Sequence, residues 1–112
     1  MIRFSSIIDD IAFQKIKTGK KRVKFFLCDK KRADLGIGDQ FYLINRTNDS
    51  ILVTVEQILI SSNLEKLVLK FPLQFLGESD YNVAVENLKQ WFSDENIEKY
   101  SVMGVLIKIE KA

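Results

Sequence analysis

The sequence predicts an α+β fold in one domain, residues 1–112, with a small, nearly closed β-barrel of about five to six strands and flanking helices. Three observations support this prediction. Hydrophobic residues make up 46% of the chain and charged residues 29%, a globular balance with enough apolar material for one core. A length of 112 residues suits one ordinary domain and is too short for two. Segments typical of strands are interrupted by segments whose apolar residues recur at helical spacing.

The first half of the chain predicts a helix followed by three strands. Ser6 with Asp9 resembles a capping box, and apolar residues then recur at helical spacing until Gly19, a natural helix terminator. β-branched and aromatic residues dominate three later segments, of which the last two are joined by polar turn residues as in a hairpin. The predicted strands are 20–28, 41–46 and 51–60.

The second half predicts helices and a closing strand. Ser62 and Glu65 form a capping box, the apolar residues after them follow helical spacing, and Pro72 ends that helix. A longer helix comes next, and Ser93 caps a further short one. The last segment is almost continuously apolar, which indicates a buried strand. The predicted ranges are 83–92 and 94–100 for the helices and 102–109 for the strand.

The composition favours a cytoplasmic protein without a cofactor. No apolar run approaches the roughly 20 residues that a membrane span needs, and the first residues lack the long apolar stretch of a secretory signal. Cys28 is the single cysteine, so an internal disulfide is excluded and a reducing compartment is expected. The chain contains no histidine, which excludes histidine-based catalytic triads and histidine-ligated metal sites. We therefore expect no metal and no other cofactor.

The charge of the chain is unevenly distributed although the net charge is only +2. Residues 15–32 carry nine basic side chains against Asp29 alone, and residues 78–98 carry six acidic side chains against Lys89. An asymmetry of this size favours an anionic partner. The alternative interpretation is two solvated faces of opposite charge that balance each other.

Basic residues at the start of the first predicted strand are the candidates for site chemistry. Alternate residues of a strand point to opposite faces, so Lys20, Arg22 and Lys24 are predicted to share one face. Lys21 falls on the apolar face, where a desolvated lysine serves as a base or as an anchor for an anion. The rarity of buried lysine favours the alternative, in which Lys21 only extends along the surface where the strand begins.

Two further features are interpreted as structural. The turn containing Gly36 and Gly38 is followed by a strand, whereas a dinucleotide-binding loop is followed by a helix. Trp91 and Phe92 belong to a predicted helix and are interpreted as packing residues, because a domain of this size needs most of its aromatic residues in the core.

Several short motifs follow one another over nearly the whole chain. They are Phe13-x-x-Ile16-x-x-Gly19-x-Lys21, Asp29-x-x-Arg32, Gly36-x-Gly38-Asp39-x-Phe41, Phe71-Pro72, Trp91-Phe92-Ser93 and Gly104-Val105-Leu106-Ile107. Each motif is weak alone, but in this order they resemble the ASCH domains of the PUA-like superfamily, and their small bacterial type in particular. The resemblance implies a small mixed β-barrel with helices covering one side.

The resemblance also implies a ligand and a place for it. It implies a cleft beside the first predicted strand, lined by Gly19 and Lys21, and an RNA, nucleotide or modified-nucleoside ligand. One bacterial branch of the family is an amidohydrolase that acts on acetylated cytidine through a lysine, a threonine and a glutamate. This chain departs from the family pattern, since Arg22, Lys24 and Phe26 stand where threonine, glutamate or threonine, and arginine are usual. The resemblance therefore implies binding more than catalysis.

Three functions follow from these observations. An RNA- or nucleotide-binding module with a cationic cleft, without catalysis, is preferred. An amidohydrolase acting on a modified nucleoside such as acetylated cytidine is the first alternative, with Lys21 as base or nucleophile and Glu86 as its acid–base partner. A protein-interaction module that uses the acidic residues 78–98 is the second. The predicted ligand-binding residues of the preferred function are Gly19, Lys20, Lys21, Arg22, Lys24, Lys30, Lys31 and Arg32.

Overall fold

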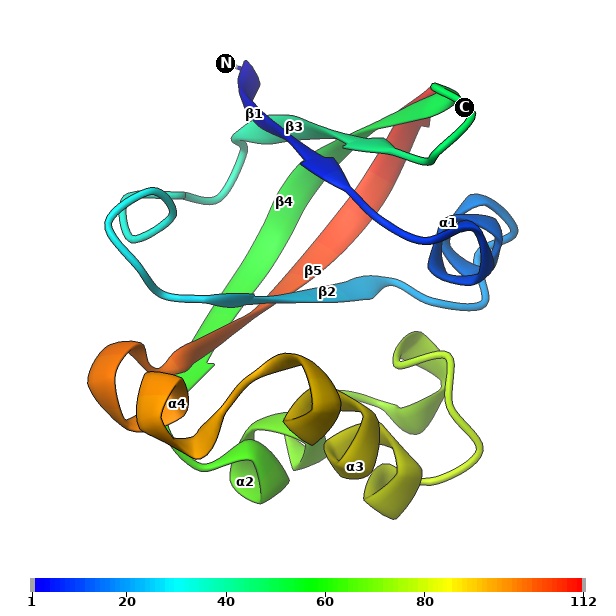
Figure 1. Ribbon diagram of the computed structural model, residues 1–112. Helices are drawn as coiled ribbons and strands as arrows, with labels where there is room; N and C mark the ends of the chain where they lie inside the picture. Colours follow the sequence, from blue (N-terminus) through cyan, green and yellow to red (C-terminus); the bar gives the residue numbers. More distant parts are fainter. Residues whose placement is uncertain (1, 112) are drawn as a thin grey trace.

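The computed structural model describes residues 2–111, which form one mixed five-stranded sheet in the order β1-β3-β4-β5-β2 (Figure 1). β1 pairs with β3 in parallel, and the other neighbouring strands are antiparallel. The sheet curls into a half-barrel that stays open between its edge strands, β1 and β2. The α+β class and the mixed barrel of five strands are thus confirmed. The strands are β1 (Ile2–Ile7), β2 (Val23–Leu27), β3 (Gln40–Ile44), β4 (Ser50–Ser61) and β5 (Val102–Lys111).

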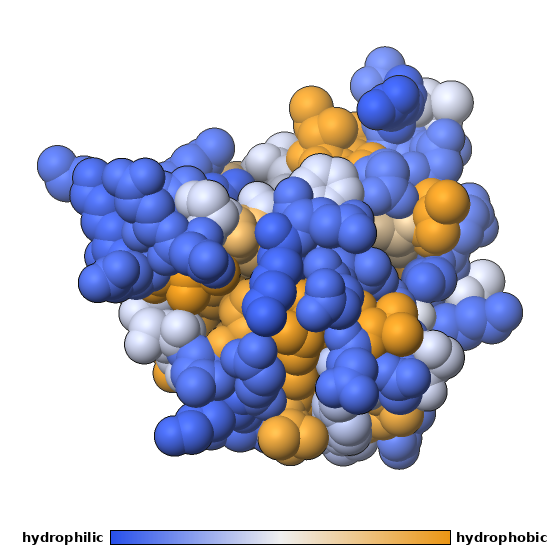
Figure 2. All heavy atoms as spheres, turned by 60° about the horizontal axis from the view of Figure 1, so that its bottom comes forward, coloured by the Kyte–Doolittle hydropathy of each residue, from blue (hydrophilic) through white to orange (hydrophobic). Residues whose placement is uncertain are grey.

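Helices flank the half-barrel as predicted. One helix follows β1, and the other helical segments form a layer on the far side of β2 (Figure 1). From that side, apolar atoms are seen in recesses between protruding hydrophilic side chains (Figure 2). No helix within residues 2–111 is long and apolar enough to cross a membrane. The helices are α1 (Asp10–Lys17), α2 (Leu64–Leu69), the 3-10 turn η1 (Leu73–Phe75), α3 (Tyr81–Trp91) and α4 (Asp94–Tyr100).

The N-terminal strand β1 is the element that the sequence did not predict. Ser6 was expected to begin the first helix, but it lies in β1 and pairs with Leu43 of β3. The helix is instead capped by Asp9, whose Oδ1 accepts a hydrogen bond of 2.7 Å from the backbone N–H of Ala12. The two isoleucines of β1, Ile2 and Ile7, are both exposed, so β1 lacks the alternation of a half-buried strand. Its parallel partner strand also lies more than thirty residues away along the chain.

The N-caps of α4 and α2 were also predicted, the first correctly and the second one residue too early. Ser93 caps α4, with its Oγ accepting from the backbone N–H of Asn96 at 3.2 Å, as expected. Ser62 was predicted as the N-cap of α2, but the N-cap is Asn63, whose Oδ1 accepts a hydrogen bond of 3.0 Å from the backbone N–H of Lys66. Both serine and asparagine are strong capping residues, so the sequence alone did not separate these neighbours.

The sheet separates two apolar cores. The inner core lies within the curve of the half-barrel and contains Phe26 and Phe41. The outer core lies between the sheet and helices α2 to α4 and contains Phe25 and Phe71. Phe25 and Phe26 are neighbours on β2, and their side chains enter opposite cores because strand residues alternate between faces. The edge strand β2 is therefore packed on both faces.

Gly104 of β5 makes the packing beneath β2 possible. It pairs with Phe25 across the β2–β5 ladder. A Cβ atom at Gly104 would lie 2.7 Å from Cε2 of Phe71 and 3.1 Å from Cε1 of Phe25. The two aromatic rings, packed edge to face with centroids 6.1 Å apart, thus occupy the volume that a side chain would need.

Candidate functional site

A cleft opens beside β2, between the region where β1 passes into α1 and the C-terminal half of α3. It has two adjoining parts, of about 610 Å³ and about 360 Å³. The larger part extends toward α1 and the turn after η1, and the smaller part extends toward β1 and the loop after β2. Both parts are lined by Asp9, Ala12, Lys21, Phe25, Leu88 and Trp91.

Lys21 lies where the two parts of the cleft meet. Its backbone forms an isolated antiparallel bridge with Leu76, and its N–H donates to the carbonyl oxygen of Lys15 at 3.0 Å. Gly77, the residue after Leu76, has a φ of +71°, and a Cβ atom there would lie 2.9 Å from Cβ of Lys21. Glycine thus permits both the left-handed turn and its close approach to Lys21. Lys21 lines both parts of the cleft together with Phe25, whereas the rarity of buried lysine had favoured a side chain that only extends along the surface.

The ammonium group of Lys21 is in a mixed electrostatic environment. Burial lowers the pKa of Lys21, and the neighbouring charge of Lys15 lowers it further. The carboxylates of Glu78 and Asp9 oppose this change by favouring the charged form. Lys21 is therefore a largely desolvated lysine with two acidic neighbours, Glu78 and Asp9.

The side chain of Lys24 has a strongly lowered pKa. Burial, followed by the positive charges of Lys21 and Arg32, lowers the pKa of Lys24 from 10.5 to about 8. Its Nζ lies 5.4 Å from the ring centroid of Phe26 and lines the smaller part of the cleft. Lys21, Lys24 and Arg32 thus line the same, smaller part of the cleft. Their mutual repulsion is only partly offset by the carboxylate of Asp9.

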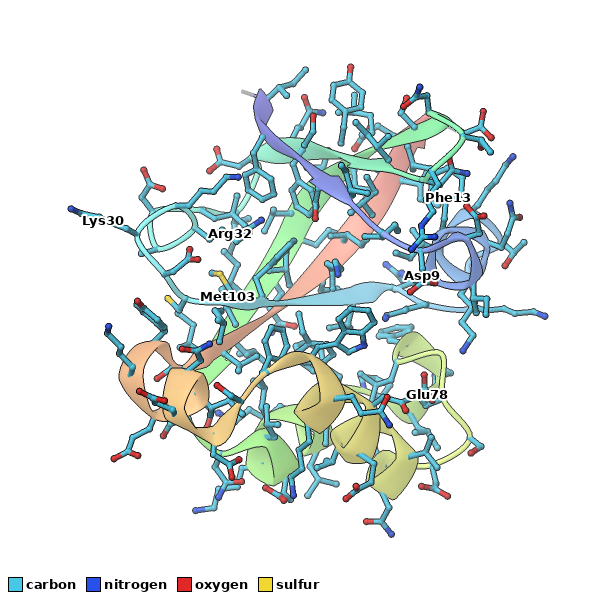
Figure 3. The ribbon with its side chains drawn as sticks, in the orientation of Figure 1. Asp9, Phe13, Lys30, Arg32, Glu78 and Met103 are labelled. Atoms are coloured by element: carbon cyan, nitrogen blue, oxygen red, sulfur yellow. The ribbon has the colours of Figure 1, made fainter. Side chains whose placement is uncertain are left out.

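Arg32 completes the cationic cluster from the loop that follows β2. Its guanidinium carbon lies 4.7 Å from the ring centroid of Phe26 and 5.0 Å from that of Phe4, so aromatic rings hold the side chain. Asp29 pairs with it at 3.9 Å. Nε of Arg32 and Oδ1 of Asp29 are buried and make no hydrogen bond within residues 2–111. Figure 3 shows Arg32 near one end of β2 and Asp9 near the other.

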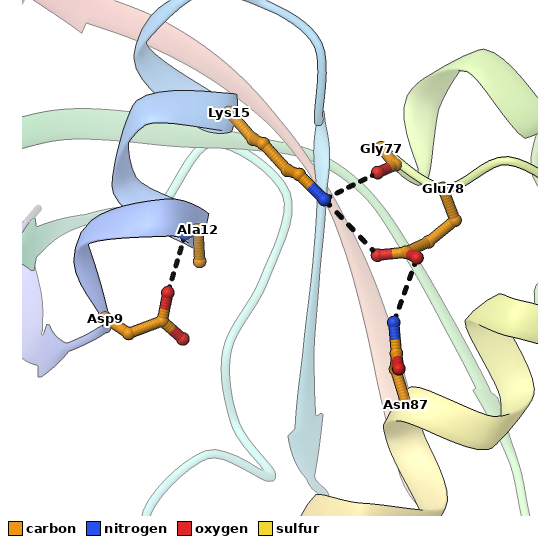
Figure 4. A network of polar contacts seen from close by, with 6 residues as sticks. All are labelled: Asp9, Ala12, Lys15, Gly77, Glu78 and Asn87. Atoms are coloured by element: carbon orange, nitrogen blue, oxygen red, sulfur yellow. Dashed lines mark hydrogen bonds and ion pairs between the residues drawn. The ribbon is translucent and has the colours of Figure 1, made fainter.

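A polar network fixes the wall of the larger part of the cleft (Figure 4). Lys15 on α1 donates to the carbonyl oxygen of Gly77 at 3.0 Å and lies 3.6 Å from Oε1 of Glu78. The other oxygen of Glu78 accepts from the side-chain amide of Asn87 on α3 at 2.9 Å. The network connects α1 and α3 through the turn after η1, and it holds Glu78 beside the cleft.

Several residues predicted for the site lie outside this cleft. Lys20, Lys30 and Lys31 are exposed and are not among the residues that line it. Arg22 pairs with Glu56 at 2.9 Å. The guanidinium of Arg22 also lies over the ring of Phe75, and together with Gly19 it borders a separate shallow recess. Among the predicted residues, the structure brings together Lys21, Lys24 and Arg32.

Glu86, predicted as the acidic partner of Lys21, is exposed on α3 and does not line the cleft. The physical reason is helical periodicity. Ala84, Asn87, Leu88 and Trp91 form the face of α3 that borders the cleft, with Gln90 at its margin, and position 86 falls outside that face. The acidic groups near Lys21 are Glu78 and Asp9, which the sequence reasoning did not select.

Trp91 is a further cleft residue that the sequence did not identify. It was interpreted as a packing residue, but 73% of its surface is exposed, so that interpretation is wrong. Phe92, the next residue, packs against the outer core as predicted. Trp91 is the last residue of α3 and lies on the side of the helix that borders the cleft. Its position at the end of a predicted helix was the only available signal.

Comparisons with known proteins establish the class of fold. No protein-family model matches the chain, and no curated protein matches it either. Among solved structures, an ASCH domain from Lactobacillus crispatus superimposes with a TM-score of 0.64 at 15% identity, covering 95% of this chain and 79% of that one. The chain therefore has the fold of this ASCH domain, as the ordered motifs predicted.

Two further solved structures match the chain over almost its entire length. Hypothetical protein PH0355 has a TM-score of 0.81 at 23% identity, covering 97% of this chain and 99% of that one. Protein PF0455 from Pyrococcus furiosus has a TM-score of 0.73 at 19% identity, and both chains are covered completely. At these identities the likeness concerns the fold, and the chemistry of the cleft has to be argued from its own residues.

Proposed function

We propose that the chain is a non-catalytic module that binds RNA or a nucleotide in the cleft beside β2. The convergence of Lys21, Lys24 and Arg32 on this cleft is the observation that supports the proposal most directly. Three cations brought together and partly desolvated repel one another, and a phosphate would relieve that repulsion. The exposed Lys30 and Lys31 lie in the same loop as Arg32, where they would contact further phosphates of a longer strand.

The PUA-like fold adds a second line of support. The motifs that resemble ASCH domains imply a nucleic-acid or nucleotide ligand, and the cleft lies beside the strand to which the resemblance assigned it. The cleft combines cations with apolar side chains such as Phe25 and Leu88, a lining suited to a ligand with both a phosphate and a flat ring.

Binding of a single-stranded RNA hexamer and of adenosine 5′-monophosphate (AMP) at increasing salt tests this proposal. Neutralisation of about three phosphates of the hexamer, one in the cleft and two at Lys30 and Lys31, predicts a slope of about −2 in a plot of log affinity against log salt. Lys21→Gln and Lys24→Gln are each expected to weaken binding of AMP about tenfold, because each removes a charge-assisted contact. Lys66→Gln, which alters an exposed lysine on α2 outside the cleft, is the matched control.

The outcomes separate the two ligand sources. Binding of the hexamer without AMP would indicate RNA, and binding of AMP alone would indicate a free nucleotide. Affinity that is unchanged between low and high salt, or that both cleft variants retain in full, would contradict the proposal. Thermal unfolding followed by circular dichroism establishes that each variant is folded before its affinity is interpreted.

Hydrolysis of an acylated nucleoside is a second candidate, favoured by the carboxylates next to Lys21. Glu78 and Asp9 influence the pKa of Lys21 and line the larger part of the cleft with it. A lysine with a lowered pKa and a neighbouring carboxylate are the kind of proton-transfer groups that amide hydrolysis requires. In this candidate Glu78 takes the role that the sequence suggested for Glu86.

This candidate predicts release of cytidine when the protein is incubated with acetylated cytidine. Lys21→Ala and Glu78→Gln are expected to abolish the release, since each removes one proton-transfer group. Glu86→Gln, on the exposed face of α3, is expected to match the wild type. Chromatography of the nucleosides gives the readout. If the wild type releases no cytidine, hydrolysis is excluded and the binding proposal is unaffected.

A further inference from the structure

Large exposed apolar side chains gather at the mouth of the cleft. Trp91 is 73% exposed, Ile11 is 72% exposed and Ile7 is 78% exposed. Ile11 borders the larger part of the cleft, Ile7 the smaller part, and Trp91 both. Water contact with such side chains is unfavourable, and an aromatic residue in a cleft is a common contact for a ligand.

Trp91 faces the cleft because of its place on α3. Leu88 lies three residues before it, on the same helical face, and also lines both parts of the cleft. Ala84 and Val85 of α3 are buried in the outer core, and Tyr81 and Leu88 pack against it, so the helix is anchored without Trp91. The indole is therefore free to contact a ligand without disturbing the core.

The indole and the cations border the same space. Lys21 is common to both parts of the cleft, as is Trp91, and the smaller part adds Lys24 and Arg32. A ligand that filled the smaller part would meet charge from the β2 side and an aromatic surface from the α3 side. Phosphate and base of a nucleotide match these two surfaces, and every base offers a flat face for stacking.

We infer that Trp91 is the stacking platform of the cleft, on which the base of a nucleotide lies while its phosphate contacts Lys21, Lys24 and Arg32. This inference rests on the proposed function and specifies its ligand as a molecule that has both an aromatic base and a phosphate. The base comes either from a free nucleotide or from an unstacked position of single-stranded RNA, and the recognition chemistry is the same.

The test measures how much of the affinity depends on the base. Isothermal titration calorimetry of the wild type and Trp91→Ala is carried out with AMP, ribose 5-phosphate and the RNA hexamer. Trp91→Ala is expected to weaken binding of AMP, of the hexamer or of both by about 5- to 150-fold, the range for loss of one base–aromatic stack. Binding of ribose 5-phosphate, which has no base, is expected to change less than about twofold.

Two controls sharpen the measurement. Trp91→Phe keeps a ring and is expected to retain most of the affinity for AMP. Leu69→Ala removes a side chain that is 63% exposed on α2, outside the cleft, and is expected to leave the affinity unchanged. Trp91 is the single tryptophan, so quenching of the wild-type fluorescence by AMP, but not by ribose 5-phosphate, reports stacking directly.

The outcomes distinguish this inference from the proposed function. If Lys24→Gln loses affinity for AMP and Trp91→Ala does not, the stacking role is wrong and the cationic cleft stands. If the wild type binds neither AMP nor the hexamer, both are wrong. Equal loss of ribose 5-phosphate and AMP binding in Trp91→Ala would reveal a structural role and overturn the inference. A wild-type dimer that Trp91→Ala converts to a monomer of unchanged affinity would assign the indole to a contact between copies.

Discussion

Replacement of Lys24 with methionine is expected to raise the free energy of unfolding at pH 7 by about 2 kcal/mol while weakening the binding of AMP about tenfold. The pKa of Lys24 is lowered from 10.5 to about 8, so the folded protein disfavours the charged form of this side chain. A shift of this size corresponds to about 3 kcal/mol. Methionine has a similar length, carries no charge and adapts to an irregular apolar site.

The effect has a defined dependence on pH. Below pH 8 the ammonium of Lys24 is charged in the folded and unfolded states, so its full cost is present. Between pH 8 and 10.5 the folded protein releases this proton more readily than the unfolded chain, and the cost disappears. The stability advantage of Lys24→Met over the wild type should therefore shrink as the pH rises through this window.

Urea unfolding of both proteins from pH 7 to 10.5 measures this difference. Lys30→Met serves as the control, since Lys30 is exposed and its replacement should change stability by less than about 0.5 kcal/mol. Equal stability of the wild type and Lys24→Met at every pH would show that Lys24 is not under electrostatic strain. A methionine variant that bound AMP normally would remove Lys24 from the site.

Replacement of Gly104 with alanine is expected to lower the free energy of unfolding by about 2 kcal/mol. The new Cβ atom would lie 2.7 Å from Cε2 of Phe71 and 3.1 Å from Cε1 of Phe25. Both rings are buried, so neither can rotate away into solvent. Because Phe25 also lines the cleft, the displacement should weaken AMP binding together with stability.

A double-mutant cycle identifies the contact that causes the loss. Phe71→Leu removes the ring atoms that crowd position 104, so Gly104→Ala should cost less in that background, by about 1 kcal/mol or more. Gly36→Ala is the matched control, because its Cβ atom would lie 3.7 Å from the nearest atom, Oδ2 of Asp39. Additive effects of Gly104→Ala and Phe71→Leu in urea unfolding would contradict the predicted crowding.

Most elements of the fold could be predicted because their signals are local. The hairpin between β3 and β4 follows from two apolar segments joined by polar turn residues, and the cap of α4 follows from Ser93. β1 could not be predicted in the same way, since it is stabilised by pairing with the distant β3 and both of its isoleucines are exposed. Tertiary pairing, and not an apolar pattern of its own, defines this strand.

The candidate site could be predicted on one side only. The alternation of β2 predicted that Lys21 faces the apolar side, and the ordered motifs assigned the cleft to this strand. The opposite wall comes from α1, α3 and the turn at Gly77, which meet only in the folded chain. Glu86 was therefore chosen as the acidic partner where the structure has Glu78, and the exposure of Trp91 was missed.

The opening between the edge strands is spanned by side chains. β1 and β2 lie at opposite edges of the sheet, and near the smaller part of the cleft they are bridged by the rings of Phe4 and Phe26 with Arg32 packed against both. Side chains rather than a strand ladder thus set the distance across the gap. The width of the opening is therefore set by packing, whereas the rest of the half-barrel is held by the backbone hydrogen bonds between neighbouring strands.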